Sequence, residues 1–227
     1  MDSIIFSTNA SIIIQIISGI GLNGLFIELP DKHKILQSIL KLELLVQLLE
    51  LFFYILVLRP MVSTSGLPHL AAARYIDWII TTPTMLLSII ILFKYEEYLE
   101  NNINKKIEFF DFIKTERENI GRIFLYNFLM LFFGYLGEIG VIDLKLSTMI
   151  GFIFLGLTFD IIYRDYAVKS KNARKIFYYT FIVWAIYGVA ALMKTSTKNI
   201  MFNVLDIFAK NFTGLYIYYR IRNINTK

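Results

Sequence analysis

A lysine and an aspartate inside an apolar stretch are the residues of this chain best suited to chemistry. Lys210 lies twelve residues into the stretch that begins at residue 198, and Asp206 precedes it by one helical turn. At about 1.5 Å per residue, this places the amine roughly 18 Å along a helix, near the middle of a bilayer. A lysine removed from water is a good nucleophile and can hold a carbonyl compound as a Schiff base. The alternative at this point is a buried ion pair between the two residues.

A second carboxylate lies on a polar stripe of an earlier apolar stretch. At the helical period, Arg74, Asp77, Thr81 and Ser88 fall on one face. A charged side chain inside a membrane costs about 2.5 to 3.5 kcal/mol on insertion scales, so we expect this face to point into a helix bundle. Asp77 is then available to Lys210, and Arg74 supplies a balancing positive charge.

The rest of the chain provides apolar segments long enough to carry these residues across a bilayer. Of its 227 residues, 56% are hydrophobic, and about 20 mostly apolar residues in a helix cross the hydrocarbon. We predict an all-α membrane protein, integral and multi-pass, in which residues 1–227 form a single domain of seven transmembrane helices. The predicted spans are residues 4–27, 36–58, 69–93, 119–139, 145–167, 174–194 and 198–221.

The basic residues between the spans predict the orientation of the bundle. Sixteen lie on one side, whereas Arg59, Lys145, Lys194 and Lys198 lie on the other. Because cytoplasmic loops are enriched in Lys and Arg, the N-terminus is expected outside and the C-terminus in the cytoplasm. The sixteen are Lys32, Lys34, Lys94, Lys105, Lys106, Lys114, Arg117, Arg122, Arg164, Lys169, Lys171, Arg174, Lys175, Arg220, Arg222 and Lys227.

Two motifs of the chain resemble a known family. The run RYIDWIITTP, which contains Arg74 and Asp77, resembles helix C of the microbial (type I) rhodopsins, and FNVLDIFAK resembles their helix G. The triplet Asp77, Thr81 and Ser88 is similar to that of viral rhodopsins in the light-gated channel group. This resemblance implies all-trans retinal, bound to Lys210 as a protonated Schiff base with Asp77, Asp206 and Arg74 close by.

The same resemblance implies a set of residues around the retinal. Two departures from the family pattern are Gly188, at the usual place of a proline, and Ala191, at the place of a second tryptophan. We therefore expect a looser pocket at that end of the sixth span. The implied pocket residues are Trp78, Thr82, Asn127, Met130, Gly134, Trp184 and Tyr187.

The choice between a pump and a channel depends on further polar residues. Ser88 stands where an outward proton pump of this family has its internal proton donor, and a serine has no proton to lose near neutral pH. Glu43 and Glu50 lie on one face of the second span, which contributes little to the expected pocket. Polar stripes on several spans must face one another or water, because lipid cannot satisfy them. The predicted ion path consists of Ser11, Gln15, Glu43, Gln47, Glu50, Thr81, Ser88, Asn199 and Asn203.

The sequence thus favours a light-gated cation channel with an acidic, polar path between the first, second, third and seventh spans. The alternatives are a light-driven outward proton pump and, third, a sensory photoreceptor. An enzyme is not expected. With no cysteine and only two histidines, no metal site is expected either.

The expected partners are the lipid bilayer and transported cations or protons. The net charge of +5 comes largely from the loops and indicates topology rather than nucleic-acid binding. Assembly into a homo-oligomer is left open.

Overall fold

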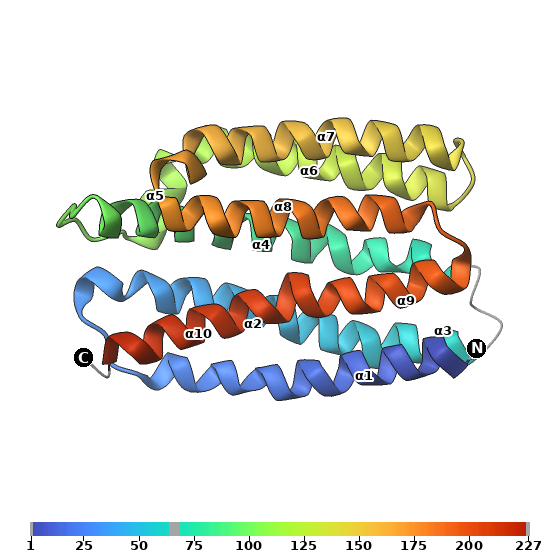
Figure 1. Ribbon diagram of the computed structural model, residues 1–227, viewed down its shortest axis with the longest axis horizontal. Helices are drawn as coiled ribbons and strands as arrows, with labels where there is room; N and C mark the ends of the chain where they lie inside the picture. Colours follow the sequence, from blue (N-terminus) through green and yellow to red (C-terminus); the bar gives the residue numbers. More distant parts are fainter. Residues whose placement is uncertain (1, 64–68, 226–227) are drawn as a thin grey trace.

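Seven long helical segments run side by side in the computed structural model, which describes residues 2–63 and 69–225 (Figure 1). Two of the segments contain a π-helical turn, η3 in the second and η6 in the seventh. Together they confirm the predicted seven-helix bundle. In chain order the segments are α1 (Asp2–Ser18) with η1 (Gly19–Phe26); α2 (Ile35–Phe53) with η3 (Tyr54–Leu58) and α3 (Arg59–Ser63); α4 (Leu70–Glu100); α6 (Arg117–Glu138); α7 (Leu144–Asp165); α8 (Lys171–Ala191); and α9 (Thr195–Asp206) with η6 (Ile207–Asn211) and α10 (Phe212–Asn225).

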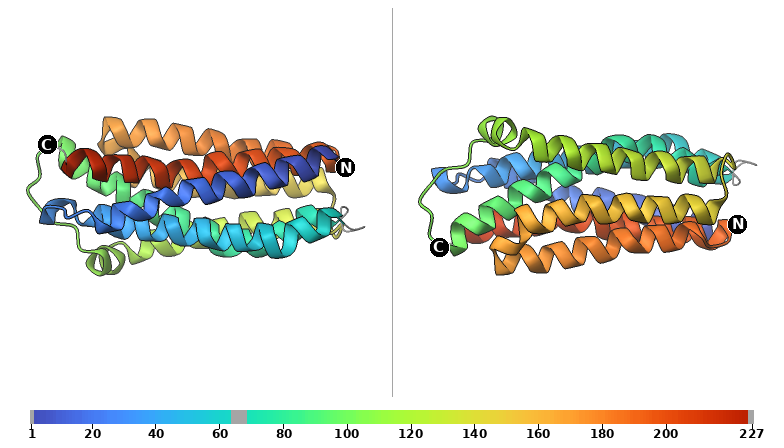
Figure 2. Two further views of the ribbon diagram at one scale, coloured as in Figure 1. Left: turned by 90° about the horizontal axis from the view of Figure 1, so that it is seen from below. Right: turned by 90° about the horizontal axis from the view of Figure 1, so that it is seen from above.

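Short elements connect these segments at their ends. The longest is α5 (Phe109–Thr115), which lies across the end of the bundle between α4 and α6 (Figure 2). Two single turns, η2 (Asp31–His33) and η5 (Ala167–Lys169), precede α2 and α8. Short loops of this kind keep consecutive helices antiparallel neighbours.

The third segment is longer than the predicted span 69–93, because α4 continues to Glu100. Charged residues of this extension bind partners at the end of the bundle. Glu96 forms an ion pair with Arg220 of α10 at 2.8 Å, and Glu100 accepts a 2.7 Å hydrogen bond from the Ser170 hydroxyl. The extension therefore ties the third, sixth and seventh segments together outside the apolar layer.

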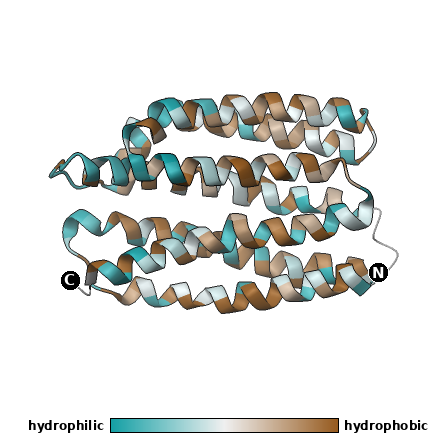
Figure 3. Ribbon diagram, viewed as in Figure 1, coloured by the Kyte–Doolittle hydropathy of each residue, from teal (hydrophilic) through white to brown (hydrophobic). Residues whose placement is uncertain are grey.

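The bundle is apolar toward its surroundings, and its interior combines an apolar core with buried polar groups that lipid cannot satisfy. Side chains such as Phe6, Leu56 and Ile79 are exposed, whereas Glu50 and Arg74 are at most 1% exposed. Hydrophilic residues also gather at the end where α4 and α10 finish (Figure 3). Polar groups thus occur mainly inside the bundle and at its ends.

Four of the helical segments are, by length and composition alone, apolar enough to cross a membrane. They include Leu70–Glu100 and Leu144–Lys169, whereas the second and seventh segments carry the intramembrane charges Glu43, Glu50 and Lys210. The two ends of the chain lie at opposite ends of the bundle, as an odd number of crossings requires (Figure 1). The protein is an integral membrane protein. Of the basic residues that predict its orientation, Lys227 lies outside the described residues.

Candidate functional site

Lys210 lies at the centre of the bundle, in the π-helical turn Ile207–Asn211. Its Nζ atom lies 2.6 Å from a carboxylate oxygen of Asp77, 3.5 Å from one of Glu50 and 3.6 Å from one of Asp206. The lysine is 2% exposed, and all three acids are buried. The two aspartates predicted to lie near Lys210 are therefore brought to it, and a third carboxylate joins them.

Arg74 supplies the second positive charge of this cluster. Its guanidinium lies 3.0 Å from a carboxylate oxygen of Asp206 and donates hydrogen bonds to the Tyr54 hydroxyl and the Asn203 side-chain oxygen. Asp206 also accepts hydrogen bonds of 2.7 Å from the hydroxyls of Tyr54 and Tyr187. A buried carboxylate is tolerated when it is paired and hydrogen-bonded in this way. Asp206 is consequently the best-satisfied acid of the cluster.

Glu50 differs from the other two acids in its surroundings. The sequence assigned it to the ion path on a segment that contributes little to the pocket, but its carboxylate faces Lys210. Both of its oxygens are buried and accept no hydrogen bond within the described ranges. The three acids face two cations, so the cluster holds one more acidic than basic group. Residues on one face of α2 lie at different depths in the bundle, and Glu50 lies at the depth of Lys210.

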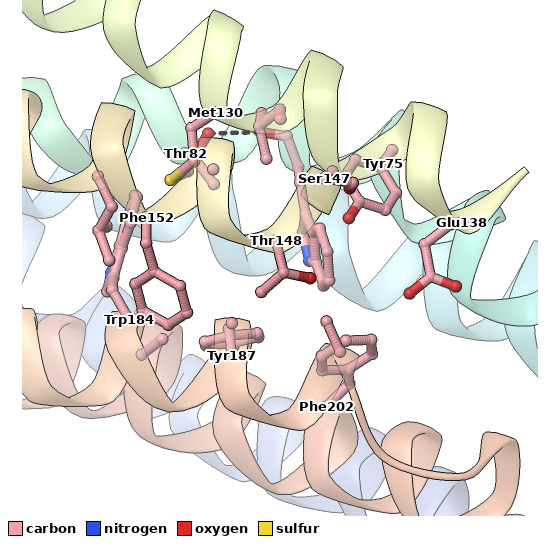
Figure 4. A pocket seen from close by; sticks show the side chains of 18 of the residues that line it. Tyr75, Thr82, Met130, Glu138, Ser147, Thr148, Phe152, Trp184, Tyr187 and Phe202 are labelled. Atoms are coloured by element: carbon pink, nitrogen blue, oxygen red, sulfur yellow. Dashed lines mark hydrogen bonds between the residues drawn. The ribbon is translucent and has the colours of Figure 1, made fainter. Parts of the chain in front are cut away.

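A cavity of about 120 Å³, part of it open to the outside, is lined by Lys210 and extends between α4, α6, α7 and α8 (Figure 4). Its walls are mainly apolar and aromatic, as in most small-molecule sites. One reactive amine at the end of a long apolar space suits a long apolar carbonyl compound. Of the predicted pocket residues, the cavity is lined by Trp78, Thr82, Met130, Gly134, Trp184 and Tyr187.

Asn127 is the remaining predicted pocket residue, and it lies behind the wall. Its amide donates a 2.8 Å hydrogen bond to the Thr82 hydroxyl, which itself donates to the Trp78 carbonyl at 2.7 Å. Asn127 is 2% exposed. It therefore holds a wall residue in place rather than lining the cavity.

The looser pocket expected at Gly188 is not found. A Cβ atom built on Gly188 would lie 2.6 Å from the ring of Phe152 on α7, so that ring already occupies the space. Both residues line the cavity, as does Ala191. The aromatic side chain comes from the neighbouring helix, which a comparison of α8 positions alone cannot reveal.

Two residues of the predicted ion path, Asn199 and Asn203, lie on α9. Asn203 belongs to the Arg74 cluster, whereas Asn199 donates a hydrogen bond within its own helix. Asn203 donates hydrogen bonds of 2.8 and 3.0 Å to Ser7 and Thr8 of α1, and its oxygen accepts from Arg74. Asn199 donates to the carbonyl of Thr195 within its own helix, and its side-chain oxygen is buried without a hydrogen bond to the described residues.

The remaining residues of the predicted path form two groups farther along the bundle. In the first, the Ser18 hydroxyl lies 2.6 Å from the Asn211 oxygen and 3.2 Å from the Gln47 oxygen, and so joins α1, α2 and η6. Gln15, whose amide donates to Ser11 at 3.2 Å, lies one turn before Ser18 on α1. All five side chains are buried.

The second group joins α2 to α4. The Ser88 hydroxyl donates to a carboxylate oxygen of Glu43, whose other oxygen is buried without a hydrogen bond to the described residues. Thr81 donates to the backbone carbonyl of Asp77 at 3.0 Å. The predicted residues are therefore all inside the bundle, although they form separate clusters rather than one continuous chain of hydrogen bonds.

The predicted site residues omit Tyr54, Ser18 and Asn211. The helical period places Tyr54 on the stripe of Glu43 and Glu50, and Ser18 on the polar stripe of α1, so the sequence did indicate that these two side chains face inward. Asn211 could not have been found in this way, because only the π-helical turn brings it to the same interior as the lysine before it.

The comparisons with known proteins agree with this geometry. A model of the family described as bacteriorhodopsin-like protein matches residues 6–224. The chain therefore belongs to the bacteriorhodopsin-like family, as its motifs indicated. No curated protein matches the chain significantly.

Solved structures show the same fold. A viral rhodopsin, OLPVRII, is 28% identical, with 97% of this chain and 98% of that chain covered and a TM-score of 0.82. A blue light-absorbing proteorhodopsin from Med12 is 18% identical, with 99% of both chains covered and a TM-score of 0.76. A light-driven proton pump from Leptosphaeria maculans is 17% identical, with 98% and 97% covered and a TM-score of 0.70.

Proposed function

We propose that the protein is a light-gated cation channel that carries retinal on Lys210. Membership of the bacteriorhodopsin-like family and the viral rhodopsin among its structural relatives support this proposal. So does the cavity, because its single lysine lies at one end of an apolar space lined by Trp78, Met130 and Trp184. Bound there, retinal would supply a light-driven change of shape next to the Lys210 amine.

The residues around Lys210 have separate tasks in this proposal. Asp77 at 2.6 Å and Asp206 at 3.6 Å stabilise a positive charge on the Lys210 nitrogen, since an unpaired charge in the low-dielectric interior is costly. Arg74 balances Asp206 and joins it to Asn203. Movement at the lysine therefore alters contacts on α2, α4 and α9 together.

The observation that carries the channel proposal is the buried polar contact that Ser18 makes with Gln47 and Asn211. Asn211 follows Lys210 directly in the chain, and its side-chain oxygen faces the Ser18 hydroxyl of α1. The amide nitrogens of Gln47 and Asn211 are buried without hydrogen bonds to described residues. A change at Lys210 is thus transmitted through one peptide bond to a three-helix contact. Opening it would allow water and cations to follow polar groups toward Glu43.

An outward proton pump is the second candidate. The contact of 2.6 Å between Lys210 and Asp77 is the arrangement that a proton transfer to Asp77 needs, and two structural relatives are described as light-driven proton pumps. Ser88 has no proton to supply near neutral pH, and it is bound to Glu43. Lys198 stands in α9 where the resemblance to the family's pumps would place a glutamate for proton release, and it is paired with Glu138 at 2.7 Å. These two positions favour the channel.

The sign of the photocurrent separates the two candidates. In voltage-clamped cells supplied with retinal, a channel's current should reverse near the equilibrium potential of its cation, whereas a pump's current keeps one direction. Glu43→Gln should shift the reversal potential or reduce the conductance, because it removes a carboxylate from the path. Glu118→Gln, at a residue whose side chain is 79% exposed, is the matched control.

One result would refute the channel, namely outward current at every voltage that persists in Glu43→Gln and is abolished by Asp77→Asn; this result would establish the pump. A normal photocurrent from Lys210→Ala would instead refute the attachment of retinal to Lys210.

A further inference from the structure

The cofactor cavity has a polar end that neither attachment to Lys210 nor an ion path uses. Four of its lining residues carry oxygen atoms there: Tyr75 on α4, Glu138 on α6, and Ser147 and Thr148 on α7. They gather at one end of the cavity, where Glu138 directs its carboxylate toward the space (Figure 4). Helices α6 and α7 form the side of the bundle opposite α1 (Figure 1). Lys210 lines the same cavity, so a long molecule attached at Lys210 can extend toward this polar end.

The Tyr75 hydroxyl makes no hydrogen bond within the described part of the chain, although its ring is held firmly. The ring packs edge-on against Trp78 at 5.0 Å and Tyr135 at 5.7 Å between centroids. Gly134 leaves room for the hydroxyl, because a Cβ atom there would lie 2.6 Å from the Tyr75 oxygen. A donor fixed in this way beside a cavity wall is available to a ligand.

Glu138, which lines the same end of the cavity, forms an ion pair with Lys198. The lysine Nζ atom lies 2.7 and 3.0 Å from the two carboxylate oxygens, and both side chains are less than 10% exposed. The ion pair links α6 to α9 at the outer rim of the cavity. A carboxylate has about four acceptor positions, so Glu138 can still accept a hydrogen bond.

Ser147 and Thr148 complete the polar wall as acceptors. Their hydroxyl protons are committed to the carbonyls of Phe133 at 2.8 Å and Leu144 at 2.7 Å. Each oxygen keeps lone pairs. The polar end therefore contains one free donor, the Tyr75 hydroxyl, opposite three acceptors.

We propose that this end of the cavity binds a hydroxyl group on the cofactor, so that the chain prefers a ring-hydroxylated retinal to retinal itself. This inference rests on the proposed attachment of retinal to Lys210. A hydroxyl accepts from Tyr75 and donates to Glu138, Ser147 or Thr148, and so satisfies both kinds of group. A plain hydrocarbon ring desolvates the same groups and leaves the Tyr75 donor unpaired, which is unfavourable.

The test is a competition between chromophores. Purified apoprotein receives equal amounts of all-trans-retinal and all-trans-3-hydroxyretinal, or of retinal and 4-hydroxyretinal, and the bound chromophore is extracted and quantified by chromatography. At least one hydroxylated form should exceed retinal about fivefold in the pigment, as one additional hydrogen bond predicts. Tyr75→Phe should bring the ratio close to one. Tyr126→Phe, at a tyrosine of α6 that packs on Phe154, should keep the preference.

Thr148→Val provides a second variant if Tyr75→Phe does not fold, and it should reduce the preference by a smaller factor. Equal incorporation of all three chromophores, or a preference that survives both variants, would overturn this inference while leaving the proposed function intact. A chain that forms pigment with none of the three would overturn the proposed attachment of retinal, and this inference with it.

Discussion

At the scale of single residues, the site is governed by how three buried carboxylates share two cations. Asp206 is held by Arg74, Tyr54 and Tyr187, and Asp77 has the shortest contact with Lys210. Glu50 has only the 3.5 Å contact with Lys210. Since an electrostatic interaction weakens with distance, the three acids cannot be equivalent toward a positive charge on the lysine nitrogen.

This inequality predicts the colours of two variants. Asp77→Asn removes the nearest negative charge and should shift the absorption of the pigment to the red, because the positive charge is then less firmly held at the nitrogen. Glu50→Gln should shift it in the same direction but by less, given 3.5 Å against 2.6 Å. Absorption spectra of purified pigments measure both shifts.

Glu43→Gln, in which the altered acid is bound to Ser88 rather than to Lys210, is the control and should leave the absorption unchanged. A Glu50→Gln pigment with the spectrum of the unmodified protein would mean that Glu50 carries no charge toward the lysine.

At the scale of elements, close helix packing determines the shape of the cofactor cavity. The contact between α7 and α8 at Phe152 and Gly188 is an example, because the aromatic ring fills the place where a larger residue on α8 would project. Such interdigitation leaves little room for added atoms. The two helices are therefore matched to each other at this position.

This packing predicts a pair of compensating substitutions. Gly188→Ala places a methyl group 2.6 Å from the ring and should destabilise the protein by about 1 to 3 kcal/mol. Phe152→Leu in the same chain should recover part of that loss, because the two residues are in direct contact. Thermal unfolding in lipid or detergent, followed by loss of colour, measures the effect.

Gly156→Ala on α7 is the matched control, since a Cβ atom there meets nothing within 4 Å. Equal stability of the Gly188→Ala and Gly156→Ala proteins would show that Phe152 moves aside without cost.

At the scale of the whole molecule, the asymmetric distribution of basic residues predicts how the bundle sits in its membrane. Lys145 lies in the first turn of α7, at the end of the bundle where the N-terminus lies, and Lys171 begins α8 at the opposite end (Figure 1). Both residues are exposed. Cytoplasmic loops carry the excess of Lys and Arg, so Lys171 should face the cytoplasm.

The absence of cysteine makes this orientation directly measurable. In intact cells, a membrane-impermeant maleimide should label Lys145→Cys and leave Lys171→Cys unlabelled until the cells are permeabilised. The unmodified protein, which has no thiol, is the control for background. The opposite labelling pattern would reverse the predicted topology and, with it, the direction assigned to any current.

The sequence alone determined the class of fold and most of the residues around Lys210. Apolar segments of membrane-spanning length can satisfy their backbone in lipid only as helices or closed barrels, and their length and number predicted the seven-helix bundle. The period of a helix was also sufficient to place Arg74, Asp77 and Asp206 on inward faces. The length of a span and the direction of its polar face are properties of a single helix, so the sequence of that segment is sufficient to predict them.

Only the tertiary structure decided which of the inward residues meet. Glu50 faces Lys210, Phe152 fills the space beside Gly188, and Asn211 reaches Ser18 because a π-helical turn changes the register of the last segment. Each of these contacts depends on the relative height and rotation of two helices. Packing between side chains distant in sequence sets the height and rotation of each helix, so they cannot be predicted from a single segment of the chain.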